Sequence, residues 1–158
     1  MKLFFNLFHW LRKKYWKVFK IETSGVRVLV FREGKVLLVK HRYGNFWIMP
    51  GGGINKNETP EQAAIRELKE EAGVVANKID FELGQYKNTT GGKNDNISCF
   101  VVTDFQEIQN FKRTFIDYLE IGEMGWFEIK NFSVDVSGPT KARIAEFLAN
   151  KRDLVGSW

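Results

Sequence analysis

The chain has 158 residues and a mass of 18.4 kDa, which bounds it to one domain with at most a short appendage. Hydrophobic residues make up 44% of the chain, a normal share for a globular core. The only cysteine, Cys99, excludes an intrachain disulfide framework and suits the reducing cytoplasm. Its apolar neighbours indicate that Cys99 is a strand residue and not a nucleophile.

The positive charge of the chain is unevenly distributed. Residues 1–20 hold six basic residues and no acidic ones. Because the whole chain carries +5 and residues 1–20 carry +6, the remaining residues sum to −1. A nearly neutral body weakens the case for a nucleic-acid-binding domain, so nucleic acid is not expected as a partner.

Residues 1–22 are predicted to form a basic amphipathic leader helix. Its apolar side chains recur at helical spacing, at Phe4, Phe8, Leu11, Tyr15, Val18 and Phe19. Charged residues interrupt the segment too often for a bilayer span, and no small-residue cleavage site marks a secretory signal. Two interpretations stay open: the helix packs on the body or on a second subunit of a homodimer, or its aromatic face lies in an anionic membrane. We expect a cytoplasmic protein, peripheral at the inner membrane surface under the second interpretation.

Strand signals dominate the remaining chain. Residues 26–31 and 36–39 are apolar and β-branched, and the four residues between them complete a predicted β-hairpin. A short strand is expected over residues 46–49, before a Gly-rich loop that contains Gly51-Gly52-Gly53. Later strands are expected over residues 79–86, 97–105 and 125–129, the last of the chain, with a polar turn over residues 87–96.

Two helices are predicted to cover this sheet. The helix over residues 60–72 begins with Thr59 as N-cap, Pro60 at its first position and Gln62 completing a capping box, and Gly73 ends it. A terminal helix is expected over residues 141–150, with a buried side made of Ala142, Ile144, Ala145, Phe147 and Leu148. The sequence therefore predicts an α/β protein, with a mixed sheet and helices on both faces.

The helix over residues 60–72 is two-sided. Its apolar side, Ala64, Ile65, Leu68 and Ala72, is expected to pack on the sheet. Its acidic side, Glu67, Glu70 and Glu71, is expected to face a cleft. Carboxylates at these spacings repel one another, and a hard divalent cation such as Mg²⁺ would remove that repulsion. The alternative is a solvated acidic helix face without a ligand.

The spacing of residues around this helix is the strongest signal in the chain. From the Gly-rich loop onward it reads Gly52, five residues, Glu58, seven residues, Arg66-Glu67-Leu68, one residue, Glu70-Glu71, one residue, Gly73-Val74. This segment resembles the Nudix box, the signature of Nudix hydrolases, at every defined position. The resemblance implies an α/β/α sandwich, with a Nudix domain over residues 23–150 and a C-terminal tail over residues 151–158. One departure, Asn55-Lys56-Asn57 where many relatives carry an acidic residue and a glycine, reads as loop variation.

The resemblance also implies roles for the box residues. Glu67 and Glu71 would be the main ligands of Mg²⁺, for which Mn²⁺ can substitute, and the Gly51 carbonyl a further ligand. Glu70 would share the metal or act as base. The other box residues would be structural: Glu58 and Arg66 pair to hold the acidic face in register, Gly52 lets the backbone approach a ligand, and Gly73 ends the helix. A direct catalytic role is the alternative for Glu58 and Arg66.

Two segments outside the box are candidates for substrate contact. Arg42 could bind a phosphate and Tyr43 could stack on a base, the alternative being a solvated hairpin end. Glu120, and after it Glu123, resembles an acidic residue that in some relatives joins the metal site or positions water. Otherwise these two are surface acids.

The resemblance implies Mg²⁺-dependent hydrolysis of a phosphoanhydride in a nucleoside diphosphate linked to another group. A small nucleotide is favoured, either a (deoxy)nucleoside triphosphate, oxidised or not, or ADP-ribose. One alternative is a catalytically silent nucleotide-binding module, although the glutamates of the box are all present. Another is an RNA-end pyrophosphohydrolase, against which the near-neutral body argues.

Overall fold

The computed structural model describes residues 22–90 and 94–158, so the expected leader helix lies, apart from Glu22, outside the described residues. No helix in these two ranges is long and apolar enough to cross a membrane. The elements are β1 (Thr23–Arg32), β2 (Lys35–His41), β3 (Trp47–Ile48), α2 (Pro60–Ala72), β4 (Val74–Val75), β5 (Phe81–Asn88), β6 (Asp95–Val102), β7 (Gln106–Glu107), α3 (Phe115–Glu120), β8 (Ile121–Glu128), α4 (Gly138–Leu148) and β9 (Leu154–Ser157).

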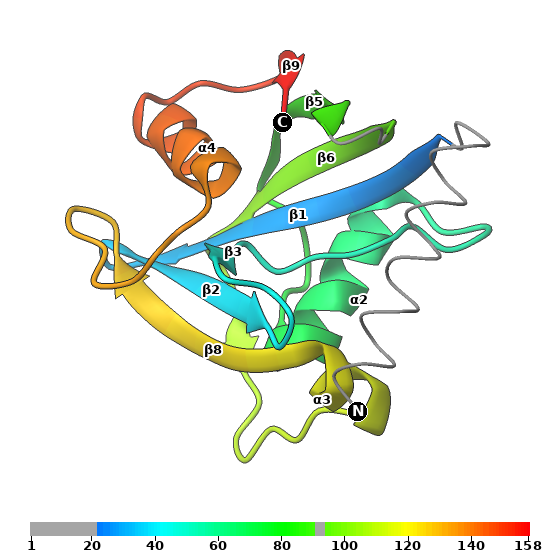
Figure 1. The fold of residues 1–158 in the computed structure, drawn as a ribbon, viewed down its shortest axis with the longest axis vertical. Helices are drawn as coiled ribbons and strands as arrows, with labels where there is room; N and C mark the ends of the chain where they lie inside the picture. The colour runs from blue at the N-terminus through cyan, green and yellow to red at the C-terminus, as the bar shows by residue number, and fades with distance from the viewer. Residues whose placement is uncertain (1–21, 91–93) are drawn as a thin grey trace.

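The sheet is mixed, as predicted, and has the order β3-β2-β1-β6-β5-β9, with β8 paired to β2 (Figure 1). Its centre is the parallel pair β1 and β6, in register from Thr23↔Asp95 to Val30↔Val102. β5 runs antiparallel to β6, and β9 adds a parallel strand at the edge. β5 and β6 also extend into the expected polar turn, where Asn88 pairs with Asp95.

The predicted hairpin of β1 and β2 is confirmed, but the two strands separate soon after the turn. Glu33 and Gly34 both have positive φ, 50° and 76°, which is the requirement of a two-residue type I′ turn. Only Phe31↔Val36 and Arg32↔Lys35 are in register, after which β2 pairs with β3 and β8. The Gly-rich loop takes the freed edge of β1, where the Val26 N–H donates to the Gly52 carbonyl at 2.9 Å. This separation brings the loop onto the centre of the sheet.

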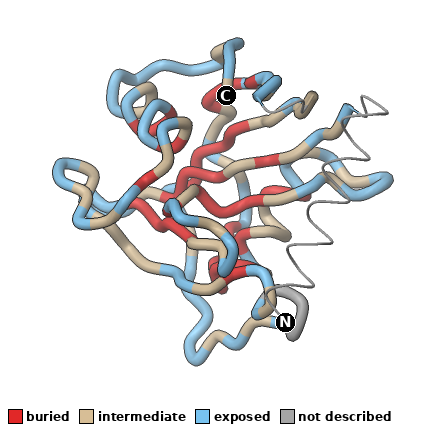
Figure 2. The backbone as a smooth tube through the Cα atoms, viewed as in Figure 1, coloured by how far each residue is buried: buried red, intermediate tan, exposed pale blue. Residues whose placement is uncertain are grey.

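A helix covers each face of the sheet (Figures 1 and 2). Because side chains alternate along a strand, Val26, Val28 and Val30 of β1 pack against α2, while Leu29 lies in the cluster under α4. The two clusters are the buried segments that cross the middle of the tube in Figure 2.

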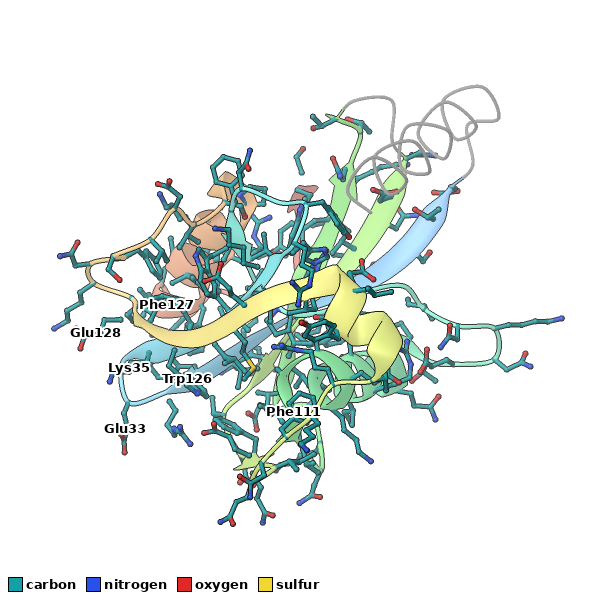
Figure 3. All side chains as sticks on the ribbon, turned by 60° about the horizontal axis from the view of Figure 1, so that its bottom comes forward. Glu33, Lys35, Phe111, Trp126, Phe127 and Glu128 are labelled. Atoms are coloured by element: carbon teal, nitrogen blue, oxygen red, sulfur yellow. The ribbon has the colours of Figure 1, made fainter. Side chains whose placement is uncertain are left out.

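β8 contributes to both clusters through two neighbouring aromatic residues, labelled in Figure 3. The Phe127 ring meets Trp47 edge-on at 4.6 Å, on the α4 side. The Trp126 ring stacks on Phe105 at 5.6 Å, on the α2 side, and the Arg32 guanidinium lies 4.6 Å from its centre. β8 is therefore half-buried on both faces. It begins at Ile121, four residues before the strand predicted from Gly125.

The predicted buried side of α4 is partly wrong. Ile144 is buried and Phe147 half-buried, but Ala142, Ala145 and Leu148 are exposed. The buried residue that the pattern missed is Arg143, which pairs with Glu146 at 2.6 Å and donates to the Ser157 carbonyl at 3.3 Å. Its guanidinium lies 3.8 Å from the Tyr86 ring centre. These contacts hold β9, a strand that hydropathy did not predict, against the sheet.

Candidate active site

Helix α2 begins and ends where the sequence predicts. The Thr59 hydroxyl accepts from the Gln62 N–H at 3.2 Å, and the Gln62 side chain accepts from the Thr59 N–H at 2.9 Å. Pro60 opens the first turn, and Gly73 closes the helix in the left-handed region with φ 61°. These contacts are local, which is why the helix bounds can be read from the sequence.

The faces of α2 are rotated from the prediction. Ala64, Leu68 and Ala72 are buried as expected, but Ala63 is buried in place of Ile65, which is half-exposed. Glu71 shares the buried face, with 6% of its surface exposed, whereas the Glu70 side chain is 40% exposed. The three glutamates of the acidic side therefore differ in environment, because Glu71 is buried and Glu70 is not.

The Glu71 carboxyl is held deep beside the Gly-rich loop. Its Oε2 accepts from the Gly51 N–H at 2.8 Å. Burial raises the pKa of Glu71 to about 8, although the Arg27 guanidinium acts to lower it. Burial also raises the pKa of Glu67. The arginines near Glu67 and Glu71 therefore do not fully offset the effect of burial on these two carboxyl groups.

Arg66 organises the other box glutamates. It donates from Nε and Nη2 to both oxygens of Glu58, at 2.8 and 3.0 Å, and this pairing lowers the pKa of Glu58 and raises the pKa of Arg66. From Nη1 it donates to Glu67 at 2.8 Å and to Glu70 at 3.0 Å. The expected contact between Glu58 and Arg66 is present, and its role in holding the acidic face remains a prediction.

The Gly-rich loop lies directly on the acidic side of α2. A Cβ on Gly52 would come within 2.5 Å of Glu67 Oε1, so a larger residue there would displace the Glu67 carboxylate. The Gly51 peptide is held at both ends: its N–H by Glu71, and its carbonyl by Arg27 Nη1 at 2.5 Å. Arg27 lies among valines on β1, and nothing in the sequence marked it as part of the site.

The donor set suits a hard divalent cation in kind. It consists of carboxylate oxygens and one backbone carbonyl, which are the ligands that Mg²⁺ prefers. Among the described residues, however, no three acidic, His or Cys side chains are already grouped to hold a metal. Two arginines contact this donor set: Arg27 donates to the Gly51 carbonyl, and Arg66 donates to both Glu67 and Glu70.

The remaining candidates meet at the end of β2. The Tyr43 hydroxyl donates to Glu120 Oε1 at 2.7 Å. Arg42 donates from Nε to the Tyr118 carbonyl at 2.6 Å, with its guanidinium 4.2 Å from the Tyr118 ring centre. Glu120 acts to raise the pKa of Glu71, so it lies within electrostatic reach of the box. Glu123 instead extends into solvent, 3.7 Å from Lys40. Roles for these residues in substrate binding or catalysis remain predictions.

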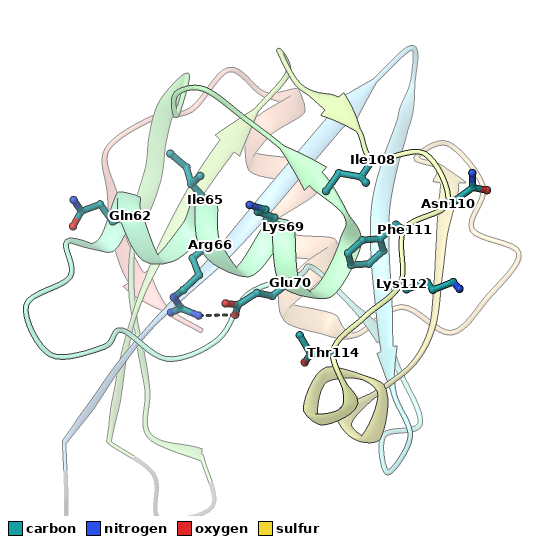
Figure 4. Close-up of a pocket in the computed structure, with 10 residues that line it drawn as sticks. All are labelled: Gln62, Ile65, Arg66, Lys69, Glu70, Ile108, Asn110, Phe111, Lys112 and Thr114. Atoms are coloured by element: carbon teal, nitrogen blue, oxygen red, sulfur yellow. Dashed lines mark hydrogen bonds and ion pairs between the residues drawn. The ribbon is translucent and has the colours of Figure 1, made fainter.

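A groove of about 690 Å³ runs along the outer side of α2 (Figure 4). Arg66 and Glu70 lie at its edge, joined by their ion pair, whereas Glu67 and Glu71 do not line it. The other lining residues are Gln62, Ile65, Lys69, Ile108, Asn110, Phe111, Lys112 and Thr114.

Cys99 has no place in this chemistry. It is buried in β6, as the sequence predicts for a strand residue. Burial raises the pKa of the Cys99 thiol to about 12, so the thiolate that a nucleophile requires is not formed at neutral pH.

Replacing Gly73 by Ala is expected to lower the free energy of unfolding by about 1–3 kcal/mol. Gly73 has a φ of 61°, and a Cβ there would lie 2.4 Å from Phe111 Cγ. Urea denaturation measures the loss, and Gly138→Ala is the control, because a Cβ on Gly138 meets nothing within 4 Å. A Gly73→Ala protein as stable as wild type would contradict the expectation.

Comparison with known proteins identifies the class. The chain matches the NUDIX domain family over residues 22–150, so it belongs to the Nudix family. It is therefore a Nudix hydrolase, an enzyme that acts on phosphoanhydride bonds.

Two relatives illustrate the breadth of that family. The chain is 37% identical to mouse diphosphoinositol polyphosphate phosphohydrolase 3-alpha over 128 residues, which cover 80% of this chain and 73% of the relative. It is 49% identical to the RNA pyrophosphohydrolase of Hydrogenovibrio crunogenus over 73 residues, covering 43% of this chain and 44% of the relative.

Solved structures support the fold. A NUDIX hydrolase from Nitrosomonas europaea has a TM-score of 0.70 at 20% identity, covering 84% of this chain and 93% of that one. The MutT NUDIX hydrolase from Burkholderia pseudomallei has a TM-score of 0.67 at 19% identity, covering 80% and 98%. The α/β fold with a mixed sheet predicted for this chain is confirmed.

Proposed function

We propose that this Nudix hydrolase is a Mg²⁺-dependent pyrophosphohydrolase of a small nucleotide, either a (deoxy)nucleoside triphosphate, oxidised or not, or ADP-ribose. The observation that carries this proposal is the buried Glu71 carboxyl, bonded to the Gly-rich loop, with Glu67 also against that loop. A buried carboxyl with a raised pKa lacks a full counter-charge, and a divalent cation would supply it.

The box residues divide the work in this proposal. Glu67, Glu71 and the Gly51 carbonyl would hold Mg²⁺ or Mn²⁺, and Glu70 would share it or act as base. The bound metal would polarise a phosphoryl oxygen and lower the pKa of a bound water. Arg66 would keep Glu67 and Glu70 oriented toward each other, as its Nη1 contacts to both favour.

The charge around the site favours a substrate with few phosphates. Arg66 is paired with a carboxylate, and Arg27 and Arg42 donate to backbone carbonyls, so part of the donor capacity of all three is already used. The whole chain carries +5 and residues 1–20 carry +6, so the chain from residue 21 onward has a net charge of only −1. A densely phosphorylated substrate would need a strongly basic site.

A second candidate substrate rests on a separate observation. The similarity to the mouse diphosphoinositol polyphosphate phosphohydrolase extends over 80% of this chain, well beyond the box. This favours including a diphosphoinositol polyphosphate in any substrate survey. The shorter match to an RNA pyrophosphohydrolase likewise favours including 5′-triphosphorylated RNA.

Phosphate and nucleotide release by the purified protein with Mg²⁺ would test the proposal. The panel holds unmodified and oxidised dNTPs, ADP-ribose, a diphosphoinositol polyphosphate and 5′-triphosphorylated RNA. We expect kcat/KM for one of the small nucleotides to exceed that for the other two classes by at least about tenfold, a difference of 1.4 kcal/mol. The reverse order would replace this substrate assignment and leave the reaction class standing.

A further inference from the structure

Arg42, the residue that follows β2, holds the junction between α3 and β8. The Arg42 N–H donates to the Glu120 carbonyl at 2.9 Å, and the Arg42 side chain binds the Tyr118 carbonyl. A Cβ on Gly122 would lie 3.2 Å from Arg42 Cγ, so the backbone is close on this side as well. The main chain of Glu120 is thereby fixed, and its side chain remains to be oriented.

Tyr43 orients that side chain. Its hydroxyl donates to Glu120 Oε1 at 2.7 Å, across 77 residues of sequence. His41 Nδ1 lies 2.7 Å from the same hydroxyl, and the two rings meet edge-on at 5.1 Å. Because the hydroxyl proton is directed to Glu120, His41 Nδ1–H is the donor to the Tyr43 oxygen. The Tyr43 hydroxyl thus accepts a hydrogen bond from His41 and donates one to Glu120.

Glu120 needs such a partner. Its side chain is 52% exposed, and an exposed glutamate samples several rotamers. Its Oε1 accepts from the Tyr43 hydroxyl at 2.7 Å and lies farther, 3.6 Å, from His41 Nδ1. A carboxylate held in one orientation is suited to orient an attacking water, whereas a freely rotating one is not.

We propose that Tyr43 is a positioning residue for hydrolysis, which holds the Glu120 carboxylate in one orientation through its hydroxyl. The inference rests on the proposed function of the site. It gives Tyr43 a different role from stacking on a base, because the groups that matter are its hydroxyl and its bond to Glu120. Stacking on a base would require only the ring. Tyr43 as a whole residue is 42% exposed.

Tyr43→Phe separates the two roles, because it removes the hydroxyl and keeps the ring. We expect kcat on the best substrate of the panel to fall about tenfold, with KM within about twofold and an unchanged Tm. In a Glu120→Gln background, which itself lowers kcat, the same change should cost less than about twofold, since the partner is already altered. Tyr86→Phe is the control: it removes another hydroxyl-to-carboxylate bond, to Glu146 at 2.8 Å, on the α4 side of the sheet.

Each other outcome would overturn the inference. Wild-type kcat in Tyr43→Phe, with KM raised in Tyr43→Ala, would assign Tyr43 to stacking. Independent losses in the double variant would mean that Tyr43 does not act through Glu120, and a fall in Tm with kcat would indicate a structural bond. Full activity in Glu120→Gln would mean that hydrolysis does not need the Glu120 carboxylate, which would overturn the role of Tyr43. Loss of activity in Glu71→Gln would still support the proposed function.

Discussion

Replacing Glu71 by Gln is expected to reduce Mg²⁺-dependent hydrolysis by about 10³-fold while leaving the fold intact. The amide cannot carry the negative charge that a divalent cation would need at this position. It can still accept the Gly51 N–H, which now bonds to Glu71 Oε2 at 2.8 Å. Because burial raises the pKa of Glu71 to about 8, the metal-free protein already holds a largely neutral group at neutral pH. The neutral amide therefore fits the same cavity.

Steady-state kinetics and calorimetric titration with Mg²⁺ together check this expectation. Activity and metal affinity should both fall, whereas the thermal unfolding of the metal-free protein should not weaken. Glu61→Gln is the matched control, because it makes the same change on the same helix at an exposed position outside the site. A Glu71→Gln protein that retains wild-type activity would refute the assignment of Glu71 to the metal.

The parts of the site that follow from near neighbours in sequence could be predicted. Helix α2 begins at Pro60 and ends before Gly73 as expected, because its caps are contacts between residues three or four apart. The contact of Arg66 with Glu58 was likewise expected from the spacing of the box. Such contacts depend on little beyond the local backbone.

The parts that depend on distant segments could not be predicted. Whether Glu70 or Glu71 is buried is decided by the distant segments that pack on α2, and the helical pattern alone put both on one side, facing a cleft. Arg27 reaches the Gly51 carbonyl only because β2 leaves the edge of β1 and the loop replaces it. The bond from Tyr43 to Glu120 spans 77 residues. The spacing of apolar residues along the sequence does not predict contacts between such distant residues.

The same limit explains the error on α4. Hydropathy assigns arginine to the outside of a helix, so Arg143 was placed with the exposed residues. In the fold it is buried because Glu146 neutralises it and the Tyr86 ring covers it. A charge that is paired within its own helix and covered by an aromatic ring from another strand escapes any single-residue scale.

Without divalent metal, the protein is expected to lose stability as the pH rises from about 5 to about 8. The pKa of Glu71 is about 8 in the folded protein, against 4.5 for an ordinary glutamate. Between these values the folded state keeps a proton that the unfolded state has released, so the free energy of unfolding falls with pH. At 1.36 kcal/mol per pH unit, the loss sums to roughly 4 kcal/mol. The raised pKa of Glu67 acts in the same direction.

Glu58 acts in the opposite direction and in a separate range. Arg66 lowers its pKa below 4.5, so its contribution to stability is present at neutral pH and is lost only in acid. Urea denaturation in EDTA between pH 5.5 and 8 therefore isolates the buried carboxyl groups. We expect the free energy of unfolding of the wild type to fall across this range and that of Glu71→Gln to fall much less. Equal slopes for the two proteins would contradict the assignment.

Adding Mg²⁺ should reverse the trend in the wild type. A metal binds the ionised carboxylate, so its stabilisation of the folded state, RT ln(1 + [Mg²⁺]/Kd), grows as the pH rises. The gap between the curves with Mg²⁺ and with EDTA should be widest near pH 8 and close below pH 6. In Glu71→Gln the gap should stay small at every pH. The buried charge that destabilises the metal-free protein would then be the same charge that binds the metal.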